Sequence, residues 1–164
     1  MTQSAASLSA EIVRLLTATH RTIAVAESLT GGLLTAELVR TPGASAVLRG
    51  GIVAYHTDLK HSLLGVDVAL LAEHGPVHPE VAAQMATGVR ARLAVDGTPA
   101  DIGISTTGVA GPGPEGGHPA GTVFLGFAIG GTAQSTRLSL TGDRDEVRAA
   151  VVLESLRALA HLLA

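Results

Sequence analysis

A serine lies in a polar turn closed by two glycines, where the stretch ESLTGG (27–32) follows a short apolar run. A serine hydroxyl held on a strand-to-helix turn can attack a carbonyl carbon. Backbone N–H groups around Thr30–Gly32 could then hold the resulting oxyanion. The alternative is that Ser28 or Thr30 only caps the following helix, and the segment taken alone favours this cap. The stretch is not G-x-S-x-G, so it does not predict an α/β-hydrolase elbow.

The stretch AYHTDLK (54–60) contributes Lys60 and Tyr55, the only tyrosine of the chain. A lysine can take a proton from a serine if burial or neighbouring charge depresses the pKa of its amine. The alternative is a solvated lysine on a helix surface. Because Ser28 is not followed by a lysine in the pattern S-x-x-K, a Ser–Lys pair would have to form between two strand ends.

Two further segments carry groups that could bind an anion. The stretch STTGVAGPGPEGG (105–117) follows a predicted strand, and N–H groups exposed by its glycines suit an anion; the alternative is a flexible surface loop. In TGDRDEVR, Arg144 stands in the first turn of a predicted helix, where a cation is disfavoured, so it indicates an anion nearby. The alternative is a surface pair with Asp145 or Asp101.

The histidines do not predict a metal site. His74 and His78 are four residues apart, but Gly75 and Pro76 interrupt the helix that would place both on one face. The chain has no H-E-x-x-H motif and no cysteine, which excludes disulfides and zinc–thiolate sites. We therefore predict neither a metal nor another cofactor.

Hydrophobic periodicity predicts the elements that position these groups. Helix and strand alternate through the first two-thirds of the chain, which is typical of parallel strands with crossover helices, and a late hairpin joined by residues 131–133 adds antiparallel pairing. We predict a single α/β domain over residues 1–164, a three-layer α/β/α sandwich with a mixed, mostly parallel sheet of about five strands. The predicted strands are 22–26, 48–56, 100–108, 122–130 and 134–140; helices are predicted over 7–20, 31–43, 57–66, 68–75, from Pro79 onward and over 143–164.

The composition is that of a globular protein. Of 164 residues, 46% are hydrophobic and 15% charged, which excludes a disordered chain. Aromatic residues make up 2% and the net charge is −3, so neither stacking platforms nor a basic patch predicts a nucleic-acid partner. We find no signal-peptide pattern and no apolar run of transmembrane length. The sequence therefore predicts a cytoplasmic protein with no membrane association.

The order of the motifs resembles the CinA C-terminal domain family, the nicotinamide-nucleotide amidohydrolases or NMN deamidases. The resemblance covers residues 8–160 and implies hydrolysis of the carboxamide of nicotinamide mononucleotide to nicotinate mononucleotide and ammonia. It implies a Ser-Lys mechanism without a metal. The motifs that carry it are ESLTGG, TPGAS, GGIVAYHTDLKHSLLGV, HGPVHPEVAAQMATGVR, STTGVAGPGPEGGHPAGTVFLG and TGDRDEVR.

The resemblance also assigns roles. It implies Ser28 as nucleophile, Lys60 as base and Tyr55 as a third catalytic residue. The residues that it implies in substrate binding are Thr30, Gly31, Gly32, Thr107, Gly108, Gly111 and Arg144.

Two positions depart from the family pattern. Leu29 stands where cysteine is common, and we expect it to turn inward and change the packing. His78 stands where serine is usual, and we expect it to alter the rim of the site.

The resemblance leaves other functions open. One is a non-catalytic nucleotide-binding or regulatory module related to the competence/damage-inducible protein CinA, and another is an amidase for a different small amide. The length of the chain favours a stand-alone deamidase. The family resemblance further implies a homodimer.

Overall fold

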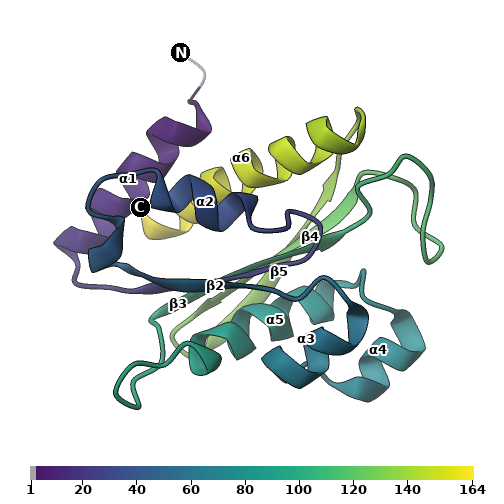
Figure 1. Ribbon diagram of the computed structural model, residues 1–164, viewed down its shortest axis with the longest axis horizontal. Helices are drawn as coiled ribbons and strands as arrows, with labels where there is room; N and C mark the ends of the chain where they lie inside the picture. Colours follow the sequence, from purple (N-terminus) through teal and green to yellow (C-terminus); the bar gives the residue numbers. More distant parts are fainter. Residues whose placement is uncertain (1–2) are drawn as a thin grey trace.

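The computed structural model describes residues 3–164, which form a five-stranded sheet with helices on both faces (Figure 1). The strands lie in the order β2-β1-β3-β4-β5. The predicted three-layer α/β/α fold is therefore confirmed. The strand bounds are β1 (Ile23–Glu27), β2 (Leu48–Val53), β3 (Ile102–Gly108), β4 (Thr122–Ile129) and β5 (Thr132–Ser139).

Six α-helices in the described residues cover the sheet, three on each face (Figure 1). One layer consists of α1 (Ala5–Ala18), α2 (Leu33–Val39) and α6 (Arg144–Leu163). The other consists of α3 (Thr57–Leu64), α4 (Val68–His74) and α5 (Pro79–Arg92). A short 3-10 helix, η1 (Ala44–Ala46), precedes β2.

The sheet is mixed, as predicted. β1 pairs in parallel with β2 and β3, whereas the β3–β4 and β4–β5 pairs are antiparallel. The predicted hairpin link at 131–133 is wrong, because β4 ends at Ile129 and β5 already begins at Thr132. The two residues between them are Gly130 and Gly131, and the positive φ of 59° at Gly130 suits a two-residue hairpin turn.

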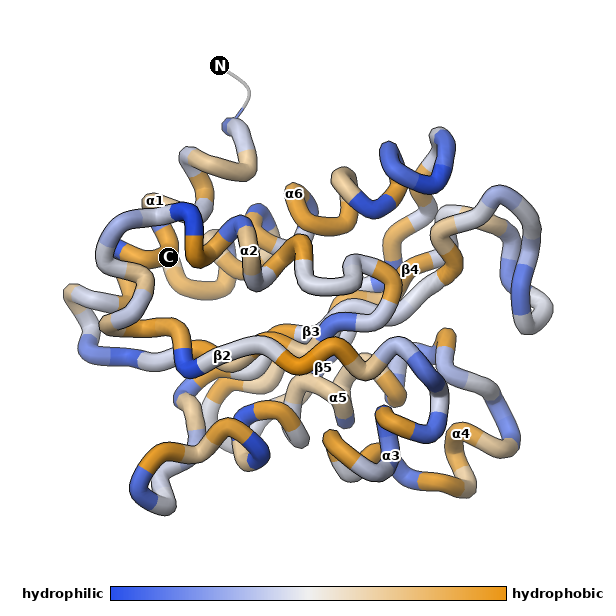
Figure 2. The backbone as a smooth tube through the Cα atoms, viewed as in Figure 1, coloured by the Kyte–Doolittle hydropathy of each residue, from blue (hydrophilic) through white to orange (hydrophobic). Residues whose placement is uncertain are grey.

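β1, which lies between β2 and β3, has a core on both sides. Ile23 and Val25 of β1 pack with the layer of α1, α2 and α6, while Ala24 and Ala26 pack with the opposite layer. This alternation follows from the two-residue repeat of a strand. Figure 2 shows the resulting apolar segments, in orange, along the strands and the helices. The short alanine side chains leave room for the helices of the second layer to approach the sheet.

The register brings the ends of the three parallel strands to one edge of the sheet. Glu27, at the end of β1, is paired with Val53 of β2 and with Thr106 of β3. The segments that leave these strands therefore start side by side. This is the edge at which ligand sites form in open α/β sheets.

Candidate active site

Ser28 and Lys60 meet at this edge of the sheet. The Lys60 Nζ donates a hydrogen bond of 2.9 Å to Ser28 Oγ and one of 2.8 Å to the Ala54 carbonyl oxygen. Ser28 directly follows β1, and Ala54 directly follows β2. The two side chains are 32 residues apart in the chain and meet because neighbouring parallel strands end together.

Lys60 is buried although it is charged in its ordinary state. It is the only lysine of the chain, and 1% of its surface is exposed. The His56 side chain accepts a hydrogen bond from the Asp58 N–H and thereby caps α3, which sets the helix direction from which Lys60 reaches back to the sheet. Burial lowers the pKa of Lys60 from 10.5 to about 8. A lysine with this pKa can act as a base near neutral pH.

A buried carboxylate anchors the turn that carries Ser28. Glu27 is fully buried and accepts hydrogen bonds from the Leu34 N–H (2.9 Å), the Thr35 N–H (3.0 Å) and the Thr35 hydroxyl (2.6 Å). Glu27 thus caps α2, whose own N-cap residue, Gly32, has no side chain for this purpose. The charge lies at the positive end of the helix, which favours a carboxylate.

The same turn is also held from β3 and from α6. The Ser28 N–H donates to the Thr106 carbonyl oxygen (3.0 Å), and the hydroxyls of Thr30 and Thr106 are hydrogen-bonded at 2.8 Å. Arg148 of α6 donates from Nε to the Leu29 carbonyl oxygen (2.9 Å) and from Nη2 to the Thr30 carbonyl oxygen (3.4 Å). Three elements therefore fix the backbone on which the serine stands.

Of the N–H groups in the turn predicted to hold an oxyanion, some already donate to a protein acceptor and others do not. The Gly31 N–H donates to the Ser28 carbonyl oxygen (3.1 Å) and is thereby used within the turn. Within residues 3–164, the N–H groups of Leu29, Thr30 and Gly32 donate to no protein acceptor. Of these three residues, Leu29 lines the cavity, so its amide is the one that remains for an anion there.

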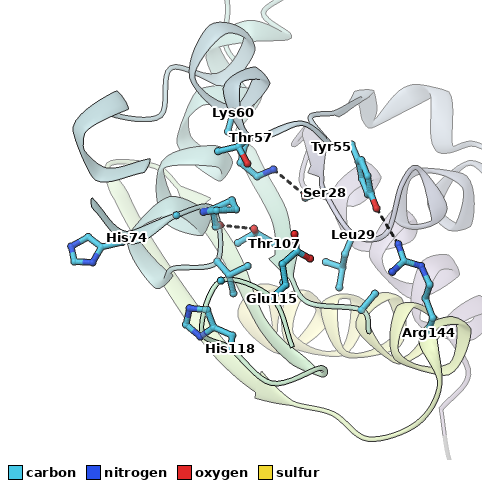
Figure 3. A pocket seen from close by; sticks show the side chains of 16 residues that line it. Ser28, Leu29, Tyr55, Thr57, Lys60, His74, Thr107, Glu115, His118 and Arg144 are labelled. Carbon is cyan, nitrogen blue, oxygen red and sulfur yellow. Dashed lines mark hydrogen bonds between the residues drawn. The ribbon is translucent and has the colours of Figure 1, made fainter. Parts of the chain in front are cut away.

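Ser28 and Lys60 open into a cavity of about 360 Å³, a size in the range of small-molecule sites (Figure 3). Its walls come from the ends of β1 and β3, from α3, from the segment between α4 and α5, and from the loop between β3 and β4. The lining residues are Ser28, Leu29, Tyr55, Thr57, Lys60, His74, Gly75, Pro76, Val77, Thr107, Gly108, Ala110, Glu115, Gly116, His118 and Arg144.

Tyr55 and Arg144 form a second pair in this cavity. The Arg144 Nη2 donates to the Tyr55 hydroxyl oxygen at 3.0 Å, and Nη1 donates to the Gly111 carbonyl oxygen at 2.6 Å. Figure 3 shows the tyrosine hydroxyl turned to Arg144 and not to Lys60. The alternative pairing of Arg144 with Asp145 or Asp101 is wrong, because Asp145 contacts Arg148 and Asp101 contacts Thr22.

The remaining predicted substrate residues fall into two groups. Thr107 and Gly108 line the cavity, but the Thr107 hydroxyl donates to the Pro76 carbonyl oxygen at 2.7 Å and so holds the opposite wall. Thr30, Gly31 and Gly32 do not line the cavity but build the turn behind Ser28. Gly111 also lies outside the lining, and its carbonyl oxygen accepts the hydrogen bond from Arg144.

The two departures from the family pattern have structural explanations. Leu29 is buried in the core, as expected, and one side of it faces the cavity. His78 accepts a hydrogen bond from the Glu80 N–H and caps α5, a task that a serine also performs. Its ring stacks on His74 at 4.5 Å, and burial, together with His74, lowers the pKa of His78. In residues 3–164 no group of three or more His, Asp or Glu is arranged for a metal ion.

Three residues of the site have no assigned role in the sequence interpretation: Glu27, Arg148 and Glu115. A charged residue at the end of a buried run was the available signal for Glu27, since such a carboxylate requires partners. Arg148 lies more than a hundred residues from the turn it binds, and no spacing rule connects the two. The position of the Glu115 side chain depends on the conformation of the loop between β3 and β4.

The fold and the buried Ser–Lys pair define a three-layer α/β protein whose site, a serine hydroxyl bonded to a lysine amine, is suited to nucleophilic chemistry. The family model of the CinA C-terminal domain matches residues 5–163. The chain belongs to this family, and the resemblance seen in the motifs is confirmed.

Known relatives and solved structures also point to the CinA family. A CinA-like protein of Frankia casuarinae is 46% identical over 96% of this chain, and a putative competence-damage inducible protein of Halothermothrix orenii is 46% identical over 87%. The chain spans about a third of the length of these relatives, 35% and 34%. The crystal structure of a CinA superfamily protein from Enterobacter cloacae matches with a TM-score of 0.92 and 30% identity, covering 100% of this chain and 95% of that one. In the described residues, no helix has both the length and the apolar character to cross a membrane.

Proposed function

We propose that this protein hydrolyses the carboxamide of nicotinamide mononucleotide, with Ser28 as nucleophile and Lys60 as base. The observation that carries the proposal is the 2.9 Å contact between Lys60 Nζ and Ser28 Oγ, in a cavity of small-molecule size, with the pKa of Lys60 lowered to about 8. A serine–lysine pair of this kind is one arrangement that activates a hydroxyl.

In the proposed reaction, neutral Lys60 accepts the proton of Ser28 while Oγ attacks the carboxamide carbon. The protonated lysine then returns this proton to the leaving nitrogen, which departs as ammonia. Lys60 next takes a proton from water, whose oxygen attacks the acyl carbon. As the bond to Ser28 Oγ breaks and the acid leaves, the protonated lysine returns this proton to Oγ. The cationic pyridinium ring of the substrate would disfavour a charged Lys60 still further.

Two other parts of the site have proposed roles. The amide of Leu29 is the candidate for the oxyanion, since Leu29 lines the cavity and its N–H has no other acceptor among residues 3–164. Arg144 has N–H groups beyond its two bonds and would hold the phosphate, with Tyr55 orienting it. Tyr55 is 60% exposed and bound to Arg144, so we assign the proton transfers to Lys60.

The test is ammonia release from nicotinamide mononucleotide by the purified protein. We expect release by the wild type, loss by Ser28→Ala and no change in Ser62→Ala, which removes an exposed hydroxyl of α3. Binding of the nucleotide without release above the Ser28→Ala background would instead support a nucleotide-binding module. Release from other small amides but not from this nucleotide would support a different amidase. The homodimer implied by the family stays a prediction, which light scattering would test.

A further inference from the structure

Among the described residues 3–164, Glu115 is the one acidic residue that lines the cavity. Figure 3 shows its carboxylate pointing from the loop between β3 and β4 into the cavity, towards the side where Ser28 lies. Glu115 is exposed to solvent through the mouth of the cavity, and within residues 3–164 its carboxylate has neither a hydrogen-bond donor nor an ion-pair partner. An acceptor that faces a binding cavity without a protein partner is available to a ligand.

A tight turn fixes the position of Glu115. Glu115 and His118 exchange two backbone hydrogen bonds of 3.0 Å, and the residues between them, Gly116 and Gly117, have φ of 56° and 82°. This is the two-residue turn of a β-hairpin, in which both central residues need positive φ. Paired residues of a hairpin direct their side chains to the same face, and both Glu115 and His118 line the cavity.

The cavity separates its charges. Lys60 lies beside Ser28, and Arg144 lies beside Tyr55, while Glu115 extends from the opposite loop (Figure 3). The proposed substrate carries a carboxamide, a cationic ring and an anionic phosphate in one molecule. Lys60 is matched to the carboxamide and Arg144 to the phosphate. The cationic ring then has Glu115 as its remaining charged partner in the cavity.

We propose that Glu115 is a specificity residue that selects ligands whose carboxamide is carried by a cationic ring. The inference rests on the proposed function, because it concerns the same cavity. A bound ligand covers the carboxylate and excludes water, and the attraction between the two opposite charges rises as the local dielectric falls. A neutral ring in the same place would gain none of this attraction and would leave the carboxylate desolvated without a partner.

A carboxylate can also accept hydrogen bonds from the hydroxyls of a ribose, and the experiment has to separate the two roles. Nicotinamide mononucleotide and its 1,4-dihydro form serve as probes, because they share the carboxamide, ribose and phosphate but differ in ring charge. Binding is measured by titration calorimetry in the Ser28→Ala protein, where no turnover interferes. The quantity compared is the ratio of the two dissociation constants.

We expect Glu115→Gln, introduced into the Ser28→Ala protein, to shift this ratio about tenfold against the cationic form. The control is Asp96→Asn, which removes one negative charge from an exposed turn outside the cavity and should leave the ratio unchanged. An unchanged ratio in Glu115→Gln would overturn the inference. This includes the case in which both probes lose affinity by the same factor, which is the result expected of a ribose contact.

The outcome is distinguishable from a failure of the proposed function. Ammonia release with no dependence of the ratio on Glu115 retains the amidase and rejects the role of Glu115. A shifted ratio without ammonia release from the wild type retains the role of Glu115 in binding and rejects the amidase. Binding of neither probe rejects both.

Discussion

The turn after β1 and the loop after β3 leave the same edge of the sheet but are built in opposite ways. The turn at 28–32 is short and is fixed by Glu27, by Thr106 and by Arg148. The loop at 109–121 is long and mostly exposed beyond Ala110, and Arg144 reaches it at one carbonyl oxygen, that of Gly111. Its far end is held by its own hairpin turn.

The difference indicates a division of tasks. A nucleophile has to be placed within a fraction of an ångström of the reacting atom, and rigid surroundings serve this need. A loop with few contacts can close on a ligand at little cost, which suits recognition. We therefore expect changes at the turn to affect turnover and stability, and changes at the loop to affect affinity.

The largest effect is expected for Lys60→Met, which removes the proposed base and keeps an unbranched apolar stem of similar length. Turnover should fall by about 10³-fold or more, in the range found when the members of a catalytic unit are removed. The measurement is the kcat for ammonia release. Arg92→Met, which removes an exposed cation of α5, is the control and should retain activity.

A smaller effect is expected for Glu27→Gln, which should destabilise the turn. The amide has one acceptor oxygen in place of two, and its NH₂ group would face a backbone N–H that needs an acceptor. We expect a loss of about 2 kcal/mol in the free energy of unfolding, measured with urea. Glu73→Gln, on an exposed surface of α4, should change it by less than about 0.5 kcal/mol. Equal stability of the two variants would show that Glu27 does not anchor the turn.

The pH dependence of activity is expected to follow the lysine. In the proposed mechanism the neutral amine is the active form, so kcat/KM should rise with pH while Lys60 loses its proton. With a pKa of about 8, the rise from pH 7 to pH 9.5 is about tenfold and levels off at the upper end. A rate that keeps rising steeply to pH 10 would indicate a lysine with its ordinary pKa.

The smallest effect is expected at the loop, where Gly117→Ala strains the hairpin turn. A φ of 82° is unfavourable for alanine by about 1 kcal/mol, so the tip that carries Glu115 should shift. We expect KM for the nucleotide to rise a few-fold with kcat unchanged. Gly113→Ala is the matched control, since Gly113 lies in the same loop with open space around it and an ordinary φ. A fall in kcat instead would remove the contrast between loop and turn.

Sequence patterns predicted the layers and the five strands because apolar periodicity and short connections determine both. The predicted ends were wrong where a strand meets a polar turn, since β2 ends at Val53 and not at 56 and β5 begins at Thr132 and not at 134. The order of the motifs was sufficient to nominate Ser28 and Lys60, but their contact depends on strand register, which periodicity alone does not define. Arg148 was overlooked because its partners are backbone carbonyls, which every residue has. Glu115 was overlooked because the direction of its side chain depends on the conformation of two glycines.

The pKa of Lys60 is the quantity on which the account depends, and the chain allows it to be measured directly. Because Lys60 is the only lysine, protein labelled with ¹³C-lysine should give one Cε resonance in the NMR spectrum. We predict that this resonance titrates with a midpoint of about 8, as burial requires. A midpoint near the ordinary value of 10.5 would contradict the claim that Lys60 is a neutral base poised on Ser28.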